Sequence, residues 1–130
     1  MLPVDENGQI RFVRQYRHPA EKYLLELPAG VMDSDELPEV GALRELREEI
    51  GMGAKNLERI GGFYLAPGYS TEYMHVFWAS DLYASPLPGD PDERIEIIKI
   101  PIAQIKQTIE TGGIQDAKSL SALFLAQERL

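Results

Sequence analysis

The pattern of apolar and polar residues along the chain predicts a domain that mixes strands and helices. Apolar residues roughly alternate with polar ones over residues 10–17, as in a strand with one buried face. The turn-forming residues 5–8 precede this strand and predict a hairpin. Further strands are expected over residues 23–29, 57–65, 72–80 and 94–100, with an acidic, proline-rich loop over residues 81–92.

The clearest helix is predicted over residues 38–50. Pro38 suits its first turn and Gly51 its C-terminal cap. Four apolar residues on one side are expected to form the buried stripe: Val40, Leu43, Leu46 and Ile50. Two more helices are expected over residues 102–111 and 115–130. Because strands and helices do not alternate regularly, the pattern favours an α+β fold with a mixed β-sheet and helices on both faces.

Composition narrows the function classes. The 130 residues are 44% hydrophobic, which suits one compact domain over residues 1–130. The chain has no cysteine, so disulfides and thiolate metal sites are excluded, and a cytoplasmic location is expected. The net charge of −8 argues against nucleic-acid and membrane partners. There is no apolar run of membrane-spanning length and no signal peptide pattern. A phosphate-bearing substrate would need bound cations to overcome this charge, whereas the acidity alone can also simply serve solubility.

Three carboxylates share one side of the predicted helix. Glu45, Glu48 and Glu49 lie roughly opposite the apolar stripe, and like charges at these spacings destabilise a helix by roughly 0.2–0.5 kcal/mol per pair. They also face the negative end of the helix dipole. Mg²⁺ binding would favour this placement, because the ion prefers oxygen ligands. The alternative is a solvated acidic face with Arg44 and Arg47 as salt-bridge partners.

Residues 30–52 resemble the Nudix box, G-x5-E-x7-R-E-U-x-E-E-x-G-U, in which U is a bulky aliphatic residue. All nine specified positions match: Gly30, Glu36, Arg44, Glu45, Leu46, Glu48, Glu49, Gly51 and Met52. The resemblance implies the αβα sandwich of Nudix domains. It also implies Mg²⁺, with Mn²⁺ as the alternative ion, bound by Glu45, Glu48, Glu49 and the carbonyl of Ala29. Glu36 and Arg44 are implied to brace the site, with Glu36 near the metal shell.

Other segments resemble the ADP-ribose pyrophosphatase subfamily. They are residues 13–19 (VRQYRHP), residues 24–30 (LLELPAG) and Pro67, sixteen residues after Gly51. Pro67 can also be read as part of an ordinary Pro-Gly turn. The resemblance implies hydrolysis of the diphosphate bond of ADP-ribose or a related ADP-sugar, a nucleoside diphosphate derivative, to AMP and a sugar phosphate, which for ADP-ribose is ribose 5-phosphate. It further implies a homodimer. The N-terminal segment usual in this subfamily is expected to be absent from this single domain.

Several residues are candidates for the remaining roles. Arg14 and Arg17 suit contacts to phosphate or base, or form salt bridges at a strand edge. By resemblance the general base is a carboxylate well downstream of the box, here Glu93, with Asp92 and Glu96 as alternates and Glu48 as the candidate within the box. The aromatic candidates for stacking on adenine are Tyr16, Tyr69 and Tyr73, and His18 and His75 are expected to be structural or surface residues.

Two rival functions stay open. One is a Nudix hydrolase that acts on a dinucleoside polyphosphate or another sugar nucleotide. The other is a non-catalytic Nudix domain that senses a ligand. The intact set of box glutamates argues against the sensor, because a sensor could lose those charges freely.

Overall fold

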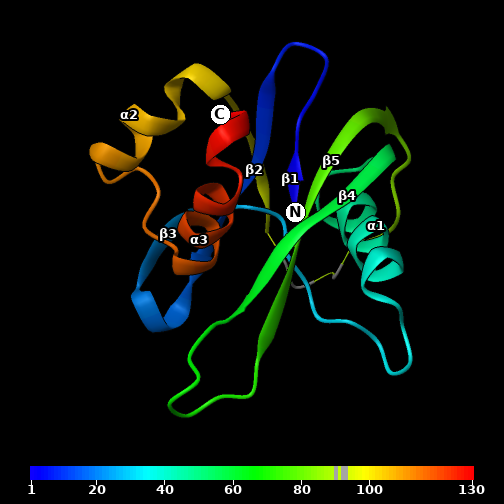
Figure 1. Cartoon of the computed structure of the whole chain (residues 1–130), viewed down its shortest axis with the longest axis horizontal. Helices are drawn as coiled ribbons and strands as arrows, with labels where there is room; N and C mark the ends of the chain where they lie inside the picture. The colour runs from blue at the N-terminus through cyan, green and yellow to red at the C-terminus, as the bar shows by residue number, and fades with distance from the viewer. Residues whose placement is uncertain (90, 92–93) are drawn as a thin grey trace.

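The computed structural model describes residues 1–89, 91 and 94–130, and its strands form two three-stranded sheets (Figure 1). The strands are β1 (Leu2–Pro3), β2 (Gln9–Arg17), β3 (Lys22–Glu26), β4 (Met52–Tyr64), β5 (Tyr73–Ala84) and β6 (Glu96–Pro101). The helices are α1 (Pro38–Glu49), α2 (Ile105–Glu110) and α3 (Ala117–Leu125), with short 3₁₀ turns at His18–Ala20, Ile102–Gln104 and Gln127–Arg129. None of these helices, in the part of the chain that the structure describes, is long and apolar enough to cross a membrane.

One of the two sheets is mixed, as the sequence predicts, and the other is antiparallel. One sheet has the order β1-β5-β4 and the other β3-β2-β6. β1 pairs with β5 in parallel, and the other pairs are antiparallel. The predicted acidic loop was placed too early, because β5 continues to Ala84 and pairs there with Met52 at the start of β4. The two strands thus form one long hairpin. Its register pairs residues that lie far apart along the chain, so no short stretch of the sequence predicts the pairing.

The layers form an α/β/α sandwich, which confirms the predicted fold class. In Figure 1, α1 lies beside β4 and β5, whereas α2 and α3 lie on the opposite side of the strands. Successive residues of a strand point to opposite faces. In β2, Phe12 accordingly packs in the core under α2 and α3, and Val13 packs in the core under α1.

The helix that carries the glutamates begins and ends close to the predicted bounds. Gly51 follows it with φ of 68°, a left-handed conformation that glycine adopts without strain. Leu46 and Ile50 are buried as predicted, but the prediction for Val40 was wrong, since 54% of this residue is exposed. The first turn buries Gly41 and Ala42 instead.

The close approach of a loop explains that change. A Cβ at Gly41 would lie 2.8 Å from a carboxylate oxygen of Glu36 in the preceding loop. The absence of a side chain at Gly41 therefore lets the loop pack on this side of α1 and leaves Val40 outside. The C-terminal helix is also shorter than predicted. It begins after Asp116, whose carboxylate accepts a hydrogen bond from the Ser119 amide at 3.0 Å.

Candidate active site

The three box glutamates line one cleft of about 630 Å³ together with Ala29 and Gly30. Only 14% of the Glu45 side chain and 27% of the Glu48 side chain are exposed. Arg44 pairs with both residues, as the alternative reading expected, but their side chains are mostly covered and this side of α1 is not a solvated face. The carboxylates of Glu45, Glu48 and Glu49 instead bring concentrated negative charge into a concave surface.

The guanidinium of Arg44 balances part of this charge. It donates to Glu45 Oε1 at 2.8 Å and to Glu48 Oε2 at 2.9 Å from the same nitrogen. It also donates to both carboxylate oxygens of Glu36 at 3.0 Å and to the carbonyl of Val31 at 3.0 Å. The hydrogen bonds to Glu36 are the main reason why the pKa of Arg44 is raised. Those bonds also lower the pKa of the Glu36 carboxyl, so both groups stay charged.

These contacts give Glu36 and Arg44 the bracing geometry that the Nudix box implies. They connect the loop before α1 to the helix and orient two of the three glutamates. Arg47, the other expected partner, instead donates to the carbonyl of Ser85 at 3.1 Å. The proposed position of Glu36 near a metal stays a prediction.

The loop before the box orients the other carboxylate. The Ala29 amide donates to Glu49 Oε2 at 3.0 Å, and the carbonyl of the same residue is the backbone ligand expected from the sequence. A Cβ at Gly30 would lie 1.9 Å from the carboxyl carbon of Glu45. Any side chain at Gly30 would therefore displace that glutamate.

The donor chemistry of the cleft fits a hard divalent cation such as Mg²⁺, because carboxylate and carbonyl oxygens are its preferred ligands. Among the described residues, no three acidic or histidine side chains are gathered at the spacing of ligands around one ion. Arg44 meanwhile holds the carboxylates of Glu45 and Glu48. A cation that binds here therefore competes with a guanidinium for these carboxylates.

Two cationic side chains, Arg17 and Lys118, also line the cleft, and each is paired with a carboxylate. Arg17 donates to both carboxylate oxygens of Glu26 at 2.8 Å, and Lys118 contacts Glu26 and, at 2.8 Å, Asp116. Burial alone would raise the pKa of Glu26, but the hydrogen bonds from Arg17 and Lys118 lower it below its usual value. The hydroxyl of Ser119, next to Lys118, accepts a hydrogen bond from the Leu27 amide, next to Glu26, at 2.7 Å.

Sequence reasoning missed Lys118 as a residue of the cleft. It lies 92 positions from Glu26, and no local pattern connects them. Arg17, by contrast, was expected near phosphate and does line the cleft.

The remaining candidates lie apart from the carboxylates. Arg14 pairs with Glu96 at 3.0 Å and lies over the ring of Tyr23, so it forms a salt bridge as the alternative expected, but between neighbouring strands and not at a sheet edge. Pro67 lies in the exposed turn between β4 and β5. Glu93 and Asp92 fall outside the described residues, so their role stays a prediction from the sequence.

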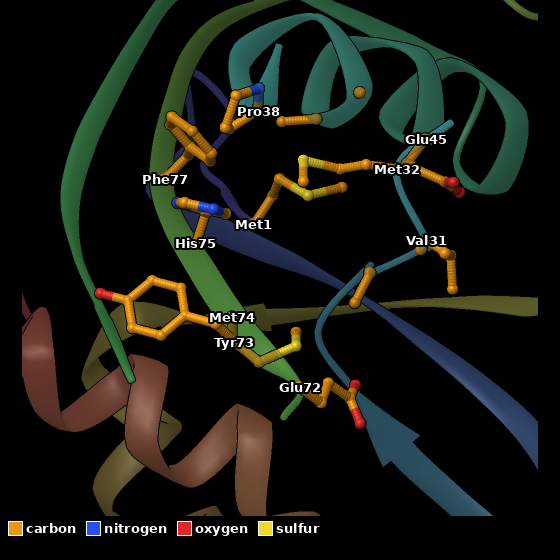
Figure 2. Close-up of a pocket in the computed structure, with 14 residues that line it drawn as sticks. Met1, Val31, Met32, Pro38, Glu45, Glu72, Tyr73, Met74, His75 and Phe77 are labelled. Carbon is orange, nitrogen blue, oxygen red and sulfur yellow. The ribbon is translucent and has the colours of Figure 1, made fainter. Parts of the chain in front are cut away.

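The candidates for stacking on a base divide into two groups. The ring of Tyr16 contacts Tyr23 and His18, and Tyr69 is 92% exposed. Tyr73 and His75 line a second pocket beside the carboxylate cleft (Figure 2). That His75 lies in a pocket wall could not be read from the sequence, because the pocket forms only once β5 is paired with its neighbours, and the expectation that His75 is a structural or surface residue stays a prediction.

A sandwich of this kind, with a box helix whose glutamates face a cleft, defines the class of protein. The family model of the NUDIX domain matches residues 1–123, and the chain belongs to the Nudix family. An ADP-ribose pyrophosphatase of Bacillus subtilis is 38% identical over 129 residues, which cover 98% of this chain and 70% of the relative. An ADP compounds hydrolase of Escherichia coli is 35% identical over 130 residues, which cover 100% of this chain and 69% of the relative.

A solved structure agrees with these matches. A crystal structure of an ADP compounds hydrolase superposes with a TM-score of 0.90 at 32% identity and covers 99% of this chain and 70% of that one. The family that the box residues indicated is thereby confirmed, and so is the fold.

Proposed function

We propose that the protein is a pyrophosphohydrolase that uses a divalent cation to cleave ADP-ribose or a related ADP-sugar into AMP and a sugar phosphate. The observation that carries this proposal is the convergence of Glu45, Glu48 and Glu49 in a cleft that Arg17 and Lys118 also line. A diphosphate needs both features, namely ligands for a bridging cation and guanidinium or ammonium donors for its oxygens. The names of the two relatives and of the solved structure support this substrate class.

Mg²⁺ is the cation that the oxygen donors favour, and Mn²⁺ would bind the same groups. Glu45, Glu48, Glu49 and the carbonyl of Ala29 are the residues proposed to hold it. When bound, such an ion polarises the diphosphate and makes an attacking water more acidic.

The protein's own groups position the reactants. Arg44, held by Glu36, fixes the carboxylates of Glu45 and Glu48. Arg17 is held by the buried Glu26 and contributes a planar donor for phosphate oxygens. This donor stays in place because its partner is itself fixed by Lys118.

A panel of substrates at fixed Mg²⁺ tests the proposal. We expect ADP-ribose to be cleaved to AMP and ribose 5-phosphate, with a kcat/KM above those of a dinucleoside polyphosphate and of GDP-linked sugars. Preferred cleavage of one of those compounds would support the rival Nudix activity. Ligand binding without cleavage of any compound, even with Mg²⁺ or Mn²⁺ present, would support the sensor.

We also propose a homodimer, on the basis of the subfamily resemblance. Sedimentation velocity at micromolar concentration should show a species of about twice the 14.6 kDa mass of one chain. A single sedimenting species of monomer mass across that concentration range would contradict the dimer.

A further inference from the structure

A polar pocket of about 760 Å³ lies at the other end of the strands from the carboxylate cleft, and we call it the basic pocket. Its walls come from the turn at residues 5–7, the start of β4 and the end of β5, with one residue each from β2 and β6. In Figure 1 this turn lies at the top, at the opposite end of β2 from β3. Arg11 lines the basic pocket, whereas Arg17, about 20 Å further along the same strand, lines the cleft. Among the described residues, none lines both cavities.

Three cationic side chains line the basic pocket, and each comes from a different strand. They are Arg11 of β2, Lys55 of β4 and Lys99 of β6. None of the three forms a salt bridge with a described residue. The chain has 21 acidic and 13 basic residues, so the lack of partners does not follow from a shortage of carboxylates.

This arrangement of charge is unfavourable for the fold by itself. Arg11 and Lys99 lie directly opposite each other in the register of β2 and β6, and like charges in that position destabilise a sheet. The Nε atom of Arg11 is buried and has no hydrogen-bond partner within the described structure. The two terminal nitrogens of Arg11, unlike Nε, are not buried and can meet a ligand in the pocket. An anion in the pocket would offset the repulsion between these cations.

The carboxylates that line the same pocket do not neutralise the three cations. Asp5 accepts hydrogen bonds from two nearby backbone amides at 3.0 and 3.1 Å, which fixes the turn. Asp81 accepts a hydrogen bond from the side-chain amide of Asn56 at 2.6 Å. Glu6 is exposed at the tip of the turn. The cationic groups are therefore left available to an anionic ligand.

We propose that the basic pocket binds the phosphate group of a small polar molecule, at a site separate from the cleft in which the diphosphate is cleaved. Phosphate oxygens accept charge-assisted hydrogen bonds from guanidinium and ammonium groups. Asn7, Ser80 and Tyr83 add amide and hydroxyl groups that suit the hydroxyls of an attached sugar. The volume lies in the range of roughly 300–1,000 Å³ that is typical of small-ligand sites, so the pocket holds more than a phosphate alone.

Inorganic phosphate, titrated into the metal-free protein at constant ionic strength, is the first probe. We expect saturable NMR shifts of the backbone amides around Arg11, Ser80 and Lys99. Shifts of the amides around Arg17 and Lys118 would instead report binding in the carboxylate cleft. Ribose 5-phosphate is the second probe. If it binds the basic pocket more tightly than inorganic phosphate does, the ligand is a sugar phosphate, and equal binding assigns free phosphate.

Substitutions measure the contribution of the cations. Arg11→Gln should weaken phosphate binding in the basic pocket about tenfold, because hydrogen bonds from a guanidinium to an anion are strong. Lys99→Gln should weaken it about threefold, because Lys99 is exposed and its charge is better screened. Lys106→Gln is the matched control, since this side chain is 86% exposed on α2 outside the pocket, and it should leave the Kd unchanged.

Thermal unfolding separates binding from a purely structural role. Without phosphate, Lys99→Gln should be at least as stable as the wild type, because it removes the like-charge pair with Arg11. Phosphate should raise the Tm of the wild type and of Lys106→Gln more than that of Lys99→Gln or Arg11→Gln, since a ligand stabilises the state that binds it. A structural role alone predicts no such dependence on phosphate.

The outcomes distinguish this proposal from the proposed function. Shifts confined to the carboxylate cleft, or a Kd that neither Arg11→Gln nor Lys99→Gln changes, would overturn the phosphate site even if Mg²⁺-dependent cleavage of ADP-ribose is intact. Phosphate binding with the expected losses, in a protein that cleaves none of the tested diphosphates, would sustain the phosphate site and overturn the hydrolase.

Discussion

Glu49→Gln is expected to lower the rate of ADP-ribose cleavage by more than about 10²-fold, since residues that merely orient metal ligands already contribute 10–100-fold. The substitution should not disrupt the fold. Glutamine keeps the side-chain oxygen that accepts the hydrogen bond from the Ala29 amide. The change also removes repulsion from Glu45, worth roughly 0.2–0.5 kcal/mol for such a pair on a helix. Without metal, the free energy of unfolding should therefore equal that of the wild type or slightly exceed it.

Three measurements on matched variants check this result. Calorimetry with Mn²⁺ should show weaker binding for Glu45→Gln and Glu49→Gln, whereas thermal unfolding of the metal-free proteins should not show a loss of stability. Glu39→Gln is the control, because Glu39 lies in the exposed first turn of the same helix and lines neither the carboxylate cleft nor the second pocket. Near-normal turnover in both Glu45→Gln and Glu49→Gln would refute the metal assignment.

The second large effect is expected at the general base. If Glu93 accepts the proton of the attacking water, Glu93→Gln should lower kcat by roughly 10²–10⁴-fold and leave KM nearly unchanged. Metal affinity should also stay the same, because Glu93 lies outside the box helix. These two readouts distinguish a base from a metal ligand.

Glu96 provides the comparison that the structure allows. It lies at the start of β6 and pairs with Arg14 at 3.0 Å, and both side chains are largely exposed. An exposed ion pair contributes little, so Glu96→Gln should cost little in rate or stability. The measurement is single-turnover cleavage at saturating Mg²⁺ for Glu93→Gln, Asp92→Asn and Glu96→Gln. Wild-type rates in all three would place the base within the box, with Glu48 as the next residue to test.

The sequence predicted the features that depend on short-range patterns. Pro38, Gly51 and the glutamates between them are local signals, and α1 follows them closely. The contact of Lys118 with Glu26 depends on how α3 docks beside β3, which no spacing along the chain encodes. The exposure of Val40 has the same kind of cause, since a loop packed on Gly41 decides which side of the first turn is buried. The burial of Nδ1 of His75, which has no hydrogen-bond partner among the described residues, likewise depends on how distant segments pack together.

The alternation along β5 has an evolutionary consequence. Tyr73, His75 and Phe77 line the second pocket, while Val76 and Trp78 between and after them pack in the core under α2 and α3. Changes in the first set leave the second set untouched, and the carboxylates lie on a different element altogether. In evolution, substitutions at Tyr73 or His75 can therefore change the wall of this pocket while the buried residues on the opposite face of β5 and the carboxylates of α1 stay in place.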